Sequence, residues 1–159
     1  MKLVNVESAI KLCKEHLDNT GAKGTEIESI LTKYLLVHIC GAYETEIKRM
    51  VAQRAAKAGD KELESFVRNS IKAFRSLRME DIRGSLLGRF SDGCRAIFDS
   101  KISGTEAEIR FTNIVLNRHS LAHGSEINIT FDELVESYYK AGKILTAIKE
   151  ALGINGGCT

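Results

Sequence analysis

Apolar residues recur three and four positions apart along most of the chain, which is the period of an amphipathic α-helix. The longest run begins at Ile27 and continues through Leu35 and Ile39 to Val51. No stretch alternates apolar and polar residues as a half-buried strand would. The sequence therefore predicts an all-α protein, a compact bundle of five to six helices. The expected helices cover residues 4–17, 25–58, 60–74, 80–100, 105–121 and 130–152.

Short polar side chains mark two of the expected helix starts. Thr25 with Glu28, and Thr130 with Glu133, have the spacing of a capping box, in which the threonine oxygen and the glutamate carboxylate each accept a backbone N–H. The chain contains no proline, so long uninterrupted helices are permitted. Gly41 leaves two alternatives open for the second pattern: one long helix, or two helices with a bend.

Composition favours one globular domain over residues 1–152, followed by a flexible tail at residues 153–159. Of the 159 residues, 43% are hydrophobic and 28% are charged, which is typical of a folded protein. The N-terminal segment is interrupted by charges, and no apolar run approaches the length of a membrane span. We therefore expect a cytoplasmic protein with no membrane partner. Cys13 and Cys40 fall in apolar helical patterns and are expected to be buried free thiols.

The formal net charge of +2 does not by itself indicate a nucleic-acid-binding protein. One segment is more basic than the chain as a whole, because residues 68–118 contain ten Lys and Arg against six Asp and Glu. A groove built from these cations would follow a phosphate backbone. An ordinary solvated set of helix faces explains the same composition equally well.

The stretch RHSLAHG, residues 118–124, interrupts the amphipathic pattern of the fifth helix. His119 and His123 are four positions apart and therefore neighbours on one helix face. Arg118 lies about 140° around the helix axis from His123, so the two converge only if the helix turns near its end, which Gly124 permits. Arginine offers paired donors to a phosphate, and histidine exchanges a proton near neutral pH. The stretch thus suits phosphate chemistry.

Residues 118–123, RHSLAH, resemble the R-x4–6-H signature of HEPN domains, in which a polar residue commonly follows the arginine. Residues 42–48, AYETEIK, resemble an acidic motif that some HEPN groups carry on their second helix. The resemblance extends from about residue 25 to residue 150. It is closest to the bacterial branch that contains the RiboL-PSP and MAE_28990 groups.

This resemblance implies a helical domain that dimerises and acts as a metal-independent endoribonuclease without a cofactor, in a toxin–antitoxin or phage-defence system. Carried over to this chain, His123 is the proton-transfer residue and Arg118 binds phosphate. His119 occupies the polar second position, and Glu44 is the acidic residue, with Glu46 competing for that role. The implied partners are RNA, a second copy of the chain and an antitoxin or inhibitor protein. The implied products carry 2′,3′-cyclic phosphate and 5′-hydroxyl ends.

Other interpretations of the same residues remain open at this stage. A non-catalytic HEPN-like module would bind nucleic acid, a nucleotide or a partner protein. Arg118 and His123 would then simply be cations near a helix C-terminus, where the helix dipole favours them. Glu44 would pair with Lys48 on an exposed face. His119 and His123 provide only half of a metal site, since no third ligand stands at suitable spacing.

Overall fold

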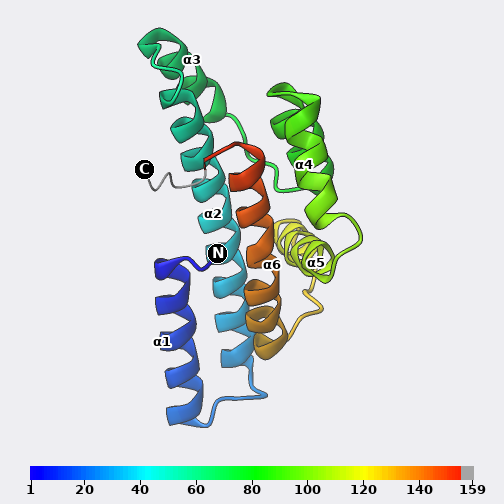
Figure 1. The fold of residues 1–159 in the computed structure, drawn as a ribbon. Helices are drawn as coiled ribbons and strands as arrows, with labels where there is room; N and C mark the ends of the chain where they lie inside the picture. Colours follow the sequence, from blue (N-terminus) through cyan, green and yellow to red (C-terminus); the bar gives the residue numbers. More distant parts are fainter. Residues whose placement is uncertain (155–159) are drawn as a thin grey trace. The chain divides into compact units, whose positions relative to one another are not determined.

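The structure, a computed structural model, describes residues 1–154, and these are helical with no strand among them (Figure 1). The prediction of an all-α fold is confirmed. Two short non-α helices, η1 (a π-helix) and η2 (a 3₁₀-helix), precede the fourth α-helix. The elements are α1 (Val4–Thr20), α2 (Glu26–Ala56), α3 (Lys61–Ile71), η1 (Asp81–Leu86), η2 (Leu87–Arg89), α4 (Asp92–Ile102), α5 (Glu106–Ala122) and α6 (Phe131–Ala151).

The chain forms two compact units, and α2 and α6 contribute to both. Unit 1 contains Met1–Ala42 and Glu106–Gly142. Unit 2 contains Tyr43–Thr105 and, among the described residues, 143–154. The single domain expected over residues 1–152 stays a prediction. Of the expected flexible tail, Gly153 and Ile154 are described, with Ile154 buried, whereas residues 155–159 lie outside the described part.

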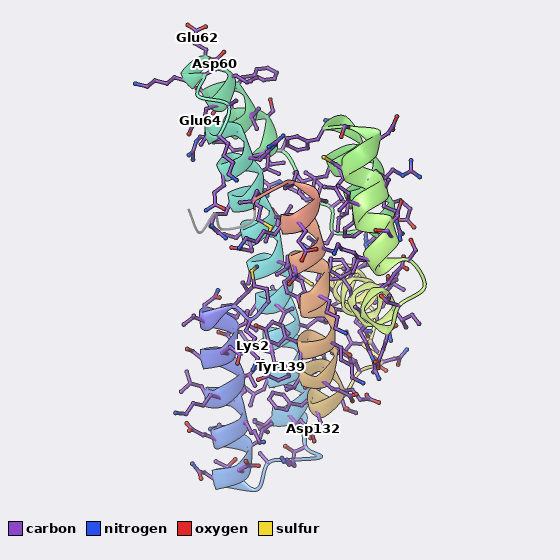
Figure 2. All side chains as sticks on the ribbon, in the orientation of Figure 1. Lys2, Asp60, Glu62, Glu64, Asp132 and Tyr139 are labelled. Atoms are coloured by element: carbon purple, nitrogen blue, oxygen red, sulfur yellow. The ribbon has the colours of Figure 1, made fainter. Side chains whose placement is uncertain are left out.

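In unit 1, α1 runs antiparallel to the first part of α2 (Figure 1). The phenol oxygen of Tyr138 on α6 accepts a hydrogen bond of 2.7 Å from the Leu3 backbone N–H and so fixes the start of α1. Beside it, the Lys2 ammonium lies 4.9 Å from the ring centroid of Tyr139 (Figure 2). Fully buried side chains make up the core of this unit: Val6, Leu17, Leu35, Leu36, Ile39, Phe111, Ile114, Phe131, Leu134 and Tyr138.

In unit 2, every α-helix except α3 contributes buried side chains. The buried side chains of this unit include Tyr43, Ile47, Met50, Ile82, Leu87, Phe98, Ile144 and Ile148. Helix α3 contributes no buried residue, although its sequence is strongly amphipathic. Asp60 caps its first turn by accepting hydrogen bonds from the Glu62 and Leu63 N–H groups at 2.9 and 3.0 Å (Figure 2). The cap therefore stabilises the start of a helix that contributes no buried side chain to the core.

The prediction of one helix over residues 80–100 is wrong. The chain forms η1 and η2 and then starts α4 anew, because the Ser91 hydroxyl oxygen accepts the Cys94 N–H at 3.1 Å as an N-cap. Apolar spacing did not reveal this break, since Leu87 before it and Phe98 after it are both buried and stand at a helical spacing. A serine side chain that satisfies backbone donors locally competes with a continuous helix.

Three other local predictions can be compared with the structure. α2 is one continuous helix, so Gly41 does not interrupt it. The Thr130–Glu133 capping box is complete, with the Thr130 N–H donating to Glu133 at 2.9 Å and the Glu133 N–H to Thr130 at 3.3 Å. At the start of α2, the Glu28 carboxylate instead accepts the N–H of Gly24 at 2.6 Å. A helix begins at each of the two predicted positions.

Cys13 and Cys40 are both buried, as predicted, and burial raises the pKa of the Cys13 thiol. Cys158 lies outside the described residues. Within residues 1–154, no helix combines the length and the apolar character that crossing a bilayer requires.

Candidate active site

The RHSLAHG stretch ends α5 with a Schellman motif, a left-handed glycine closure of the helix C-terminus. Gly124 has φ +73°, and its N–H donates to the Leu121 carbonyl at 3.1 Å. The Ser125 N–H donates to the Ser120 carbonyl at 2.9 Å, which completes the pair of bonds that defines the motif. His123 is therefore the last residue before the chain reverses, where the helix dipole favours a cation.

His119 and His123 lie together in unit 1. Their ring centroids are 4.4 Å apart and the ring planes meet at 62°, an edge-on contact. Both side chains are exposed. The two histidines are close to each other, as their four-residue spacing predicts. The reason is that α5 keeps its helical hydrogen bonds up to His123, whose N–H donates to the His119 carbonyl at 3.2 Å.

Arg118 is exposed, and its side chain makes no hydrogen bond or ion pair with the described residues. Because α5 stays helical through Ala122, Arg118 remains about 140° around the axis from His123. The turn that would bring the two side chains together within one chain comes only after His123. The structure thus brings together the two histidines and leaves the guanidinium unpaired beside them.

The positive charge of Arg110, in the first half of α5, is neutralised, in contrast to that of Arg118 near the end of the helix. The Arg110 guanidinium lies 3.4 Å from Glu106 and 3.5 Å from Glu136, and Lys140 lies 2.6 Å from each of these acids. Hydrogen bonds from Lys140 are the main reason that the pKa values of Glu106 and Glu136 are lowered. Arg118 has no such partner within residues 1–154, so its charge remains available to an anion.

Glu44 lies on α2 in unit 2, whereas the RHSLAHG stretch lies in unit 1. Its carboxylate accepts a 2.6 Å hydrogen bond from Lys48, the pair that the four-residue spacing allows. Glu46 instead binds Arg49 through both carboxylate oxygens. Each carboxylate therefore has a cation partner, and a catalytic role for Glu44 stays a prediction.

Two contacts at the motif were missed by sequence reasoning, one made by Asn117 and the other by Leu121. Asn117 donates to the Asn113 carbonyl and accepts the Asn128 N–H, both at 2.9 Å, so it ties the connection after the motif to α5. An asparagine inside a helix is a poor helix former, and this was the available signal. Leu121 lines a shallow hollow of about 430 Å³ together with Lys33, Tyr34, Val37 and His38 of α2.

The basic segment 68–118 divides into paired and unpaired cations. Five of its ten members form ion pairs: Arg68, Arg83, Arg95, Lys101 and Arg110. Among the described residues, four arginines have no side-chain hydrogen bond or ion pair: Arg75, Arg78, Arg89 and Arg118. Residues 1–154 contain no group of three or more His, Cys, Asp or Glu side chains arranged to hold a metal ion.

One comparison with known proteins gives a result. The family model described as RiboL-PSP-HEPN matches residues 2–153, which includes every helix of the structure and the whole RHSLAHG stretch. No curated protein and no solved structure matches the chain.

Proposed function

We propose a function that proceeds from one fact: this chain belongs to the RiboL-PSP HEPN family. Membership suggests a nuclease or another nucleic-acid-related function in general. We propose specifically a metal-independent endoribonuclease that acts as the effector of a toxin–antitoxin or phage-defence system. The observation that carries the proposal is the contact between His119 and His123 at 4.4 Å, next to the unpaired, exposed Arg118.

The reaction needs no metal because the substrate supplies its own nucleophile. A histidine removes the proton of the RNA 2′-hydroxyl, and O2′ attacks the adjacent phosphorus. The bond from phosphorus to O5′ breaks, and a protonated histidine returns a proton to the leaving O5′. The products are a 2′,3′-cyclic phosphate and a 5′-hydroxyl. DNA lacks the 2′-hydroxyl and is not cleaved.

Each motif residue has a distinct role in this proposal. His123 transfers the proton, since it stands at the exposed end of α5. His119 contacts the His123 ring and positions it. Arg118 binds the phosphate and stabilises the charge that develops on its oxygens in the transition state.

A second copy of the chain completes the site in this proposal. Arg118 and His123 diverge on one helix, so the phosphate bound by Arg118 is reached by His123 of the partner subunit. An exposed apolar stripe on α2 supports such a dimer: Ile27, Ile30, Tyr34 and Val37 are each 44–54% exposed and share one helix face. The hollow that Leu121 shares with Tyr34 and Val37 joins this stripe to the motif helix within unit 1.

Cleavage in the presence of EDTA tests the enzymatic proposal. A structured RNA pool is incubated with the purified wild type and with the His123→Ala, Arg118→Ala and Arg118→Lys variants. We expect cyclic-phosphate ends from the wild type and a loss of about 100-fold or more for His123→Ala and Arg118→Ala. Arg118→Lys keeps the charge but loses the paired donors, so it retains partial activity.

His16→Ala is the matched control, because His16 is an exposed histidine on α1 outside the motif. It should cleave like the wild type. If the wild type leaves RNA intact, or if both motif variants cleave normally, the nuclease proposal fails. A non-catalytic module that binds nucleic acid, a nucleotide or a partner protein would then explain the motif better.

A further inference from the structure

A cavity in unit 2, separate from the RHSLAHG stretch, has the composition of a ligand site. It occupies about 600 Å³ between α3, the connection after it and the segment from η1 to Phe90. Sites for small molecules commonly measure about 300–1,000 Å³ and combine apolar walls with a few polar groups. This volume is large enough for a nucleotide.

Phenylalanine is distributed unequally over the molecule. Of its six phenylalanines, Phe98, Phe111 and Phe131 are at most 1% exposed, as expected of core residues. The other three, Phe66, Phe74 and Phe90, all line this cavity, and Phe66 is 69% exposed. An exposed apolar ring costs free energy in water unless something covers it. Three aromatic rings at one cavity are a natural surface for stacking a planar ligand.

The cavity also has two cations that the protein leaves unpaired. Arg75 and Arg89 line it, and neither forms an ion pair or side-chain hydrogen bond with the described residues. The only carboxylate in the lining, Asp81, is engaged by the hydroxyl groups of Ser76 at 2.5 Å and Ser85 at 3.4 Å. With two arginines against one aspartate, the lining carries a net positive charge, and guanidinium groups bind phosphate through paired donors.

We propose that this cavity binds a nucleoside phosphate, with the base stacked against the phenylalanines and the phosphate held by Arg75 and Arg89. Aromatic rings combined with arginines are the means by which proteins hold unpaired nucleotides. The ligand is either a free nucleotide or one nucleotide of a single-stranded RNA. The proposal does not depend on the nuclease activity, because binding here requires neither His123 nor cleavage.

The wall composition favours a nucleotide over a partner helix. A helix lying in an apolar groove needs mainly aliphatic and aromatic contacts along its length. This cavity adds the guanidinium groups of Arg75 and Arg89, and these charged groups would be left unpaired against an apolar helix face. A sugar-phosphate offers oxygens to them.

Binding is measured with the full chain and probes that cannot be cleaved. AMP and adenosine are titrated by calorimetry, and a fluorescein-labelled 2′-O-methyl oligoadenylate by anisotropy. Phe66→Ala, Arg75→Gln and Arg89→Gln should each weaken binding about tenfold, since stacking and charged hydrogen bonds are lost. Leu63→Ala and Arg78→Gln are the matched controls: both residues are exposed in unit 2, neither lines the cavity, and each should change affinity less than twofold.

The wild type provides a test that does not rely on any variant folding correctly. AMP should bind about tenfold more tightly than adenosine, because adenosine lacks the phosphate. If AMP binds as well as the oligonucleotide does per site, the ligand is a free nucleotide. If only the oligonucleotide binds, with the same dependence on Phe66, the source is an RNA chain.

Three results would overturn the proposal. One is the absence of saturable binding for AMP and for the oligonucleotide. Another is equal weakening by Arg78→Gln and Arg75→Gln, which would indicate general charge attraction without a site. The third is a synthetic acidic amphipathic peptide that binds through Phe66 while both nucleotide probes do not. Binding of these uncleavable probes is measured separately from RNA cleavage in EDTA, so failure here is distinguishable from failure of the nuclease proposal.

Discussion

At the residue scale, Tyr138 links the stability of unit 1 to alkaline pH. Its side chain is buried and its oxygen accepts the Leu3 N–H at 2.7 Å. Burial is the main reason that the pKa of Tyr138 rises to about 12 from an ordinary value near 10. The phenol must therefore stay neutral for the folded state to keep its full stability.

We expect the free energy of unfolding to be fully maintained, as far as Tyr138 contributes, below about pH 10. The unfolded chain releases the phenolic proton near pH 10, whereas the folded chain holds it to about pH 12, so stability falls as pH rises through this window. Denaturant unfolding between pH 8 and pH 12 measures the change.

Tyr138→Phe should flatten this alkaline decline. It also removes the acceptor of the Leu3 N–H and lowers the unfolding free energy at pH 8 by about 1 kcal/mol. Tyr34→Phe, at an exposed tyrosine of the same unit, serves as the control and should leave the pH profile unchanged. An unaltered alkaline decline in Tyr138→Phe would contradict the assignment.

For Arg118, the sequence predicts which residue to consider but not whether its charge is paired. The motif and its family resemblance give Arg118, His119 and His123 as candidate site residues, and their roles stay predictions. The contact between the histidines followed from helical spacing alone. That Arg118 is unpaired while Arg110, two turns earlier, is neutralised depends on acids and a lysine contributed partly by α6, and no local pattern encodes that packing.

At the element scale, Gly124 determines where α5 ends. Its φ of +73° is strained for any residue with a side chain, so Gly124→Ala should lower the unfolding free energy by about 1 kcal/mol. Because His123 immediately precedes this turn, the variant should also reduce RNA cleavage. Thermal unfolding and the cleavage assay in EDTA measure the two effects.

Gly41→Ala is the contrasting substitution. Gly41 lies inside the continuous α2, without positive φ, and beyond its own stretch of helix no atom lies within 4 Å of an added Cβ. Alanine there should stabilise the helix by up to about 1 kcal/mol. Equal effects of the two substitutions on stability would contradict the role assigned to Gly124.

The helices themselves were largely predictable, and the exceptions have a common cause. The start of α1 and the bounds of α6 follow from apolar spacing and from the Thr130–Glu133 box, which are properties of a few adjacent residues. The change from η1 to α4 escaped prediction because buried Leu87 before it and buried Phe98 after it keep a helical spacing across it. Periodicity reports burial, whereas Ser91 decides locally where a new helix starts.

At the scale of the whole molecule, the proposed dimer predicts that two inactive variants restore each other. If Arg118 of one chain acts with His123 of the partner subunit, a mixed dimer of Arg118→Ala and His123→Ala contains one intact site and one doubly altered site. An equal mixture should recover about a quarter of wild-type cleavage, because half of its dimers are mixed and each has one working site. Sites made within one chain would recover nothing.

Val37→Glu provides the control for this experiment. A charge in the exposed stripe of α2 should convert the dimer to a monomer in sedimentation and abolish the recovery. Leu12→Glu places the same charge at an exposed leucine of α1, away from the stripe, and should alter neither. A wild type that sediments as a monomer at assay concentration would contradict the shared site.

The absence of buried residues in α3 has a consequence for how the molecule fluctuates. A helix that rests on few apolar contacts opens at a much smaller free energy than the core around it, as a separate cooperative segment. The amide hydrogens of α3 will then exchange with solvent through these local openings, whereas we expect those of α6 to exchange only when the whole protein unfolds. A ligand that fills the cavity beside Phe66 stabilises the folded form of α3. Ligand binding is therefore measurable as slower amide hydrogen exchange in this one helix.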